Sequence, residues 1–265
     1  MNKNIYEEIL ELVQRGGRGA IATVIRVKGS SPQVVGAKML VREDGSIAGT
    51  VGGGMMEARA VEKARAIIQS GKPEIITVDL TGKVEGTPVC GGEMDIYIEP
   101  LRVMPRILIF GAGHVGTELA RIAHICGFRV CIIDDRREWA NEERIPHADE
   151  IMVSSYEKVF DHLAVSPADY AVIVTRGHEH DQICLERLLN HELTYLGMIG
   201  SRKKIARIYK NLRDKGIDES LFKQVHSPIG IAIGASSPAE IAVSIMAEII
   251  QVYRNQTPGE KNCPA

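Results

Sequence analysis

Hydrophobic and polar positions alternate in short runs along the first hundred residues, which is the pattern of strands with one buried face. Turn residues separate these runs, and the dipeptide Asp44-Gly45 indicates a tight hairpin between two of them. The opening residues and the segment MEARAVEKARAIIQS repeat their apolar positions at helical spacing instead, and the second helix is expected to end at Gly71. The pattern predicts an N-terminal α+β domain over residues 1–100.

Apolar runs and helical patterns alternate beyond a linker with a proline at each end, PLRVMP. The expected strands are RILIFG, FRVCIID, DEIMVS, DYAVIVT and TYLGMI. This alternation predicts a Rossmann-like domain over residues 105–254, with a parallel sheet and helices on both faces. The last helix starts with a capping box of Ser237 and Glu240, and residues 255–265 are expected to be a flexible tail. The fold class is α/β, an N-terminal α+β domain plus a C-terminal Rossmann-like parallel sheet domain.

Composition excludes several classes of function. The 265 residues are 45% hydrophobic and 25% charged, with a formal net charge of -2, so no overall charge attracts the chain to nucleic acid or to an anionic membrane. No apolar run approaches the ~20 residues that span a bilayer. The N-terminus has the pattern of a charged amphipathic helix and not of a signal peptide. We therefore expect a cytoplasmic protein with neither nucleic-acid nor membrane partners.

The five cysteines form no C-x-x-C pair, so a structural zinc site or a dithiol redox pair is not expected. Cys126, Cys131 and Cys184 lie in apolar patterns and are expected in the core. Cys90 precedes two glycines, which would expose its thiol. A thiolate there could ligate a soft metal or carry sulfur, and the alternative is a small turn residue.

One glycine pattern predicts a nucleotide-type fold. Gly111, Gly113 and Gly116 lie between an apolar strand and a helix, where they would allow a tight turn, the approach of a phosphate, and close packing of helix on strand. The helix N-terminus favours an anion. Asp134 ends the next strand, where such folds hold a ribose hydroxyl, and Arg136 beside it would suit an extra phosphate.

The turn TRGHEHD and one residue of the glycine pattern are further candidates for contacts with a ligand. In TRGHEHD, the residues His178, His180 and Asp181 could bind a metal or a polar ligand beside the anion-binding fork of Arg176, and the alternative is a loop that caps a helix. His114, inside the glycine pattern, is either a ligand contact or a solvated residue at a helix start.

The turn GMIGSRKK offers Gly200 and Ser201 as a cradle for a phosphate, with Arg202 beside it. From Lys204 onward, the basic run is expected to be a solvated helix face.

A glycine triplet, Gly52, Gly53 and Gly54, enters a helix in the segment GTVGGGMME. Three consecutive glycines cost chain entropy, which suggests close approach of a ligand or of another chain segment. Glu57 lies in the first turn of that helix, where a carboxylate is favoured in any case.

These segments together resemble the XdhC/CoxI family, the accessory proteins of xanthine dehydrogenase and related molybdenum hydroxylases. The matching segments, in the order of the family, are GSSPQVVGAKMLV, GTVGGGMME, CGGEMDIYIEP, LIFGAGHVG, DDRREWANEERIPHAD, TRGHEHD, YLGMIGSRKK and HSPIGIAIGASSPAEIAVSIMAEI. The family often has a cysteine directly after the glycine triplet, whereas this chain has Met55. A thioether is neither a thiolate ligand nor a carrier of persulfide, so Cys90 is the remaining glycine-flanked thiol.

The resemblance implies a cofactor chaperone more than a free-standing enzyme. Such a protein would bind the molybdenum cofactor, as molybdopterin or its dinucleotide form, promote its sulfuration, and insert it into an apo molybdenum hydroxylase such as xanthine dehydrogenase. A cysteine desulfurase as sulfur donor and a homodimer are also implied, with Cys90 near molybdenum.

Two alternatives use the same glycine pattern. The first is an NAD(P)-dependent oxidoreductase, which also needs a proton donor; none of the tyrosines has a lysine four residues later, and His178 and His180 remain candidates. The second is a nucleotide-sensing module without chemistry.

Overall fold

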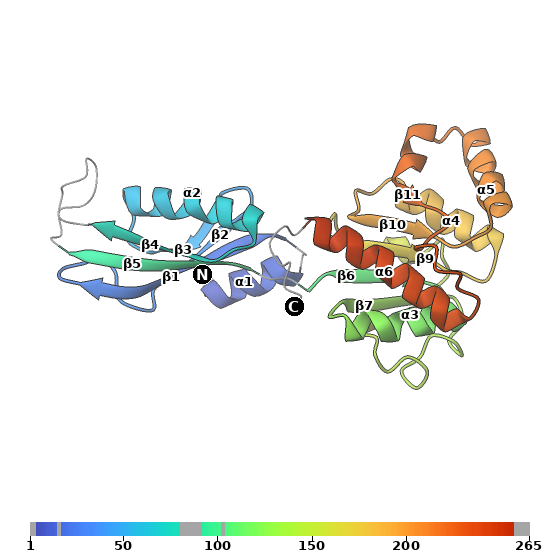
Figure 1. The fold of residues 1–265 in the computed structure, drawn as a ribbon, viewed down its shortest axis with the longest axis horizontal. Coiled ribbons are helices and arrows are strands. Elements are labelled where there is room, and N and C mark those ends of the chain that lie inside the picture. Colours follow the sequence, from blue (N-terminus) through green and yellow to red (C-terminus); the bar gives the residue numbers. More distant parts are fainter. Residues whose placement is uncertain (1–3, 15–16, 80–91, 102–103, 257–265) are drawn as a thin grey trace. The chain divides into compact units, whose positions relative to one another are not determined.

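The computed structural model describes residues 4–14, 17–79, 92–101 and 104–256. The chain divides into two compact units, of which residues 104–253 form the C-terminal one, and residues 1–103 with 254–265 form the N-terminal one. The fold class predicted from the sequence is confirmed, because one unit holds an antiparallel sheet with helices and the other a parallel sheet with helices (Figure 1). Among the described residues, none of the helices combines the length and apolar character that crossing a bilayer requires.

The N-terminal unit is a five-stranded antiparallel sheet with the strand order β3-β2-β1-β5-β4. Its elements are α1 (Ile5–Gln14), β1 (Gly19–Lys28), β2 (Lys38–Arg42), β3 (Ile47–Gly49), α2 (Gly54–Ser70), β4 (Glu74–Asp79) and β5 (Glu93–Pro100). The predicted hairpin joins β2 to β3: Gly45 has φ +88°, and the backbone N–H of Ser46 donates to the Asp44 carboxylate over 2.8 Å. Helix α2 lies along one face of the sheet and ends at Gly71 in the left-handed conformation, as predicted (Figure 1).

Alternation along the strands of this unit decides which side chains form its core. Ala22 of β1 and Ile96 and Ile98 of β5 are fully buried in the cluster that includes α2. The residues between them, such as Tyr97, belong to the opposite face. Leu12 of α1 lies against Gly19 of β1 on that opposite face, where Leu40 of β2 is also buried.

The C-terminal unit is a six-stranded, wholly parallel sheet with the order β11-β10-β9-β6-β7-β8. Its main elements are β6 (Arg106–Phe110), α3 (His114–Ile125), β7 (Arg129–Asp134), β8 (Glu150–Val153), β9 (Tyr170–Ile173), α4 (His178–Leu188), β10 (Tyr195–Met198), α5 (Arg202–Asp214), β11 (Val225–His226) and α6 (Pro238–Gln256). One core packs against α3 and α6 and the other against α4 and α5, so helices cover both faces as predicted (Figure 1).

Details of this unit refine the sequence expectations. The capping box of α6 is present, because the N–H of Glu240 donates to the Ser237 hydroxyl and the N–H of Ser237 donates to the Glu240 carboxylate. The two-residue strand β11 and the short 3-10 helices η1 (Val159–Asp161) and η2 (Glu219–Gln224) were not expected. Cys126 was expected in the core but is exposed, because it ends α3; Cys131 and Cys184 are buried as expected.

Candidate functional site

The order in which the chain adds strands to the sheet reverses between β6 and β9, which are neighbours in space although β7 and β8 separate them in the chain. Ligands of such sheets bind at the carboxyl ends of the strands where the strand order reverses. Helix α3 follows β6 with Gly113 as its N-cap, and α4 follows β9 with Gly177 as its N-cap. Within the described residues, neither N-cap carries a side-chain hydrogen bond, and no atom lies within 4 Å of the position a Cβ would take at either glycine. Two helix N-termini therefore offer backbone N–H groups beside open space.

The other two glycines of the pattern are required by packing. Gly111 has φ +120°, and a Cβ there would lie 2.4 Å from the carbonyl oxygen of Val174. A Cβ at Gly116 would lie 1.8 Å from the carbonyl oxygen of Gly111. Because only Gly113 faces open space, the structure separates two packing glycines from one that leaves room for a ligand.

Asp134 ends β7 and is fully buried. One of its oxygens accepts hydrogen bonds from the backbone N–H and Nε of Arg136, and the other accepts from the N–H of Ala112 and from Nη2 of Arg136, over 2.8 to 3.0 Å. Burial favours the neutral acid, but these hydrogen bonds outweigh it and hold the pKa of Asp134 below its ordinary value. In this arrangement both carboxylate oxygens are occupied by the protein, so Asp134 does not present an acceptor to a ribose.

Arg136 is likewise turned inward and not toward an extra phosphate. Its guanidinium lies 4.8 Å from the ring centroid of Trp139, and that of Arg144 lies 4.5 Å from the same ring. The exposed ring of His114 meets Trp139 edge-on, with 5.5 Å between centroids. The indole therefore links His114 at the start of α3 to the loop after β7.

Asp135, which sequence reasoning did not single out, joins the two sides of the candidate crevice. Its Oδ2 accepts a hydrogen bond of 2.7 Å from Nη2 of Arg176, which lies between β9 and α4. The Arg176 side chain is 48% exposed and keeps further N–H groups for a ligand.

Asp181 is part of the interior and not of a ligand surface. Its Oδ1 accepts from the backbone N–H and the hydroxyl of Thr175, and its Oδ2 pairs with Nζ of Lys204. Burial raises the pKa of Asp181. The hydrogen bond and positive charge of Lys204 oppose this rise, as do the hydrogen bonds from Thr175. Lys204 was expected on a solvated helix face, but its side chain is only 13% exposed, so that expectation was wrong.

The remaining residues of these two turns lie apart from Asp181. His178 and Arg202 are exposed at the starts of α4 and α5. Ser201 caps α5 by accepting the N–H of Lys204 over 3.3 Å. A Cβ at Gly200 would lie 2.9 Å from Cδ of Lys204, so the glycine leaves room for that side chain. Nowhere in the described part of the chain do three or more histidine, cysteine, aspartate or glutamate side chains form a group that could hold a metal.

A second candidate surface lies around the glycine triplet of the N-terminal unit. Gly52, Gly53 and Gly54 have φ of +139°, +79° and +57°, which favours glycine at each position. The Glu57 carboxylate fastens this turn, because its Oε1 accepts from the Thr50 hydroxyl over 2.5 Å and from the N–H of Gly53 over 3.2 Å. Open space surrounds the Cβ positions of Gly53 and Gly54.

One other segment of the resemblance meets this turn, and a second packs on that segment. Pro32 lies against Gly52, since a Cβ there would be 3.1 Å from Cγ of the proline. A Cβ at Gly92 would lie 2.2 Å from the carbonyl oxygen of Ser30, so the start of β5 packs on the same loop. Met55, at the start of α2, is 40% exposed. Cys90 lies outside the described residues.

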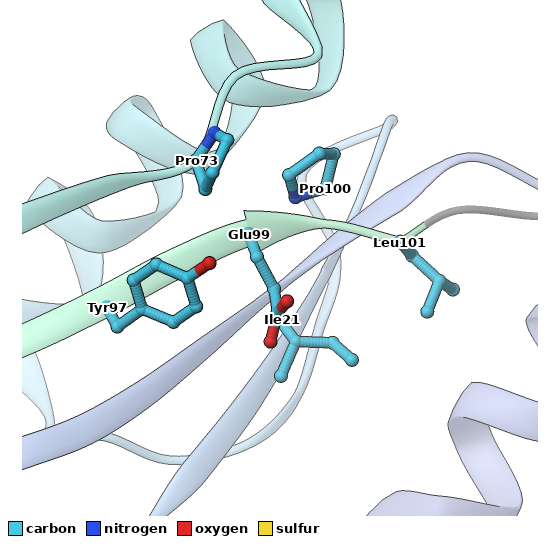
Figure 2. Close-up of a pocket in the computed structure, with 6 residues that line it drawn as sticks. All are labelled: Ile21, Pro73, Tyr97, Glu99, Pro100 and Leu101. Carbon is cyan, nitrogen blue, oxygen red and sulfur yellow. The ribbon is translucent and has the colours of Figure 1, made fainter.

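A separate hollow of about 380 Å³ lies on the face of the N-terminal sheet opposite α2 (Figure 2). Its lining combines apolar side chains with one carboxylate: Ile21, Pro73, Tyr97, Glu99, Pro100 and Leu101. No candidate residue from the sequence lines it, so we do not assign the site there.

Known proteins resemble the chain along nearly its full length. The model of the XdhC Rossmann domain matches residues 107–249, and the model of the XdhC and CoxI family matches residues 12–79. The uncharacterized protein YqeB of Escherichia coli K12 is 34% identical over 97% of this chain, and a probable xanthine dehydrogenase subunit of Bacillus subtilis 168 is 32% identical over 60% of it. The chain covers 47% and 46% of these two proteins, about half of their length.

Two further proteins match over most of both chains. The molybdenum cofactor insertion chaperone PaoD of Escherichia coli K12 is 24% identical, over 96% of this chain and 90% of its own. A crystal structure from Bacillus halodurans described as a xanthine dehydrogenase is 24% identical, with a TM-score of 0.52 over 99% of this chain and 98% of its own. At this identity the structural likeness supports the fold.

Proposed function

Because this chain belongs to the XdhC and CoxI family, we propose that it is an accessory protein that binds the molybdenum cofactor and inserts it into a xanthine dehydrogenase-type hydroxylase. The observation that carries the proposal is the match to the insertion chaperone PaoD, which includes both units of this chain. Promotion of cofactor sulfuration, with a cysteine desulfurase as donor, and assembly as a homodimer complete the proposal.

The C-terminal unit suits the anionic end of such a cofactor. The molybdenum cofactor carries a phosphate, or a pyrophosphate in its dinucleotide form. Gly113 and Gly177 begin the helices that follow the neighbouring strands β6 and β9, and neither helix has a side-chain cap among the described residues, which leaves N–H groups for phosphate oxygens. The half-exposed Arg176 stands between β9 and α4 and supplies a planar cation.

The N-terminal unit offers a second surface with open backbone. Gly53 and Gly54 bring backbone without side chains to the start of α2, where Met55 replaces the cysteine that the family often has. We assign the thiol function to Cys90, two residues before the packed Gly92, as the group that carries sulfur or approaches molybdenum. When bound, the cofactor would supply the metal whose oxo ligand is exchanged for a sulfido ligand.

The test is to purify the full chain from molybdate-grown cells and to measure molybdenum by mass spectrometry and pterin by fluorescence after oxidation. We expect both to copurify with the wild type. Gly113→Val should lower both about tenfold, whereas Cys90→Ala should retain them and fail to deliver sulfurated cofactor to an apo hydroxylase. A protein that retains neither under any condition, while folded, would overturn the proposal.

An NAD(P)-dependent oxidoreductase is less well supported, because the carboxylate that would hold the ribose is closed by Arg136. Turnover of NADH or NADPH by the purified protein would favour that alternative instead.

A further inference from the structure

The hollow of about 380 Å³ on the N-terminal unit contains one carboxylate, that of Glu99 (Figure 2). Alternation along β5 places Tyr97 and Glu99 on the face opposite α2, and Leu101 continues the series beyond the end of the strand. Glu99 is partly buried, and within the described part of the chain neither a hydrogen bond nor an ion pair reaches its oxygens. A carboxylate that is partly withdrawn from water and has no cation beside it attracts one.

Arg26 of β1 lies on the same face of the sheet, but its charge is already used. Its Nε donates to Asp95 and its Nη2 donates to Glu93, each over 2.6 Å. Both acceptors belong to β5, on the same side as Glu99. The arginine of this face therefore neutralises the two other carboxylates of β5 and leaves the charge in the hollow uncompensated.

The walls of the hollow suit a cation that has an apolar stem. Around Glu99 lie the Tyr97 ring, the aliphatic side chains of Ile21 and Leu101, and two proline rings (Figure 2). A guanidinium stacks on an aromatic ring and pairs with a carboxylate, while the methylene groups of an arginine lie along apolar surface. The volume is near the lower end of the roughly 300–1,000 Å³ of ligand pockets, which suits one long side chain more than a dinucleotide.

The surface beside the hollow indicates that its occupant is part of a protein. Ile75 of β4 is directly opposite Tyr97 in the sheet, and it is 58% exposed. An exposed isoleucine that extends an apolar hollow enlarges the apolar area that a partner can cover. A small organic cation would fill the hollow and leave Ile75 in water, whereas a polypeptide brings apolar neighbours with its arginine.

We propose that this hollow receives an arginine side chain of a partner protein. The guanidinium pairs with Glu99 and stacks on Tyr97, the methylene groups lie along Ile21, and apolar residues that flank the arginine cover Ile75. Because it requires neither molybdenum nor pterin, this docking site goes beyond the proposed function and does not depend on it.

The experiment compares two tripeptides with blocked ends, leucyl-arginyl-leucine and the same peptide with citrulline in place of arginine. Citrulline has nearly the shape of arginine without its charge. The full chain with labelled tyrosines is titrated with each peptide, and NMR follows the Tyr97 signal, which is assigned by its loss in Tyr97→Phe. We expect the arginine peptide to bind about fivefold more tightly, the effect of one ion pair at a partly exposed site, and the preference to shrink as salt is added.

Glu99→Gln keeps the size of the side chain and removes its charge, so it should abolish the preference for arginine. Glu93→Gln is the matched control, because it removes a carboxylate of the same strand and face that Arg26 already occupies. This control should keep the preference, and melting curves check that both variants are folded. The inference is overturned if neither peptide moves the Tyr97 signal, if the two bind equally, or if Glu99→Gln keeps the preference or Glu93→Gln loses it.

A last comparison distinguishes the two sources of a guanidinium. Butylguanidinium carries the same cation without flanking residues, and we expect it to bind more weakly than the arginine peptide. Equal or tighter binding of butylguanidinium would assign the hollow to a small organic cation and overturn the proposal of a partner protein.

Discussion

Lys204 of α5 pairs with Asp181, and Asp181 in turn holds the candidate ligand loop between β9 and α4. Asp181 binds the backbone and hydroxyl of Thr175, beside which Arg176 and Gly177 form the turn into α4. Lys204→Met would leave this buried carboxylate without its cation. We expect a loss of about 3 kcal/mol in the free energy of unfolding at pH 7, measured by urea denaturation.

The loss should depend on pH in a known direction. In Lys204→Met the pKa of Asp181, already raised by burial, rises further, so the cost of the charged form grows as pH increases above the ordinary aspartate value and levels off above the raised one. The difference from the wild type should therefore be largest near pH 8 and shrink toward pH 4. The double variant Asp181→Asn with Lys204→Met contains no buried charge and should be more stable than Lys204→Met. A single variant as stable as the wild type at pH 8 would contradict the role of the pair.

Asp134 carries the opposite shift and so makes an opposite prediction. Because its pKa in the folded state lies below the ordinary value of 3.8, its charge stabilises the fold at neutral pH, and this contribution is lost as pH falls below that value. Arg136→Gln removes the guanidinium bonds, so it should lower the stability at pH 7 and flatten the decline of stability in acid. Acid titrations followed by circular dichroism would detect this; an unchanged acid limb would show that Arg136 does not hold the Asp134 charge.

Among the elements, the turn from β6 to α3 contains glycines with different roles: Gly111 and Gly116 are required by packing, whereas Gly113 leaves room for a ligand. Gly116→Ala would place a methyl group 1.8 Å from the Gly111 carbonyl oxygen, and we expect it to cost about 3 kcal/mol or more of stability. Gly113 has an ordinary φ of -70° and free space, so Gly113→Ala should cost within about 1 kcal/mol. Thermal unfolding measures both, and equal losses would contradict the division of roles.

The same elements show what the sequence could predict and why. The Asp44-Gly45 hairpin and the Ser237–Glu240 capping box were predicted because their signals lie within four residues. The pairing of Lys204 with Asp181 was not predicted, because the two residues are 23 positions apart and only the packing of α5 against α4 brings them together. Gly200, which leaves room for the lysine side chain, was the one local feature related to this pairing. β11 was missed because two residues have no periodicity. Arg136 occupies the Asp134 carboxylate because of the rotamer of the arginine side chain, and composition and spacing do not specify a rotamer.

Each unit contains its own hydrophobic core, so the two units of the chain should unfold in separate transitions. The cluster against α2 draws its buried residues from Ala20 to Ile98, whereas the two clusters of the parallel sheet draw theirs from Ile107 to Ile249. Because the buried residues of each cluster belong to one unit, we expect two calorimetric transitions in the full chain, and a fragment of residues 104–256 that folds cooperatively by itself.

Gly116→Ala provides the decisive comparison, because its clash lies wholly within the C-terminal unit. In the full chain it should move one transition to lower temperature, by about 6 °C or more for a unit of this size, and leave the other unchanged. The same shift should appear in the fragment of residues 104–256. If both transitions moved together, or the fragment failed to fold while the full chain did, the two units would have to be treated as one cooperative body.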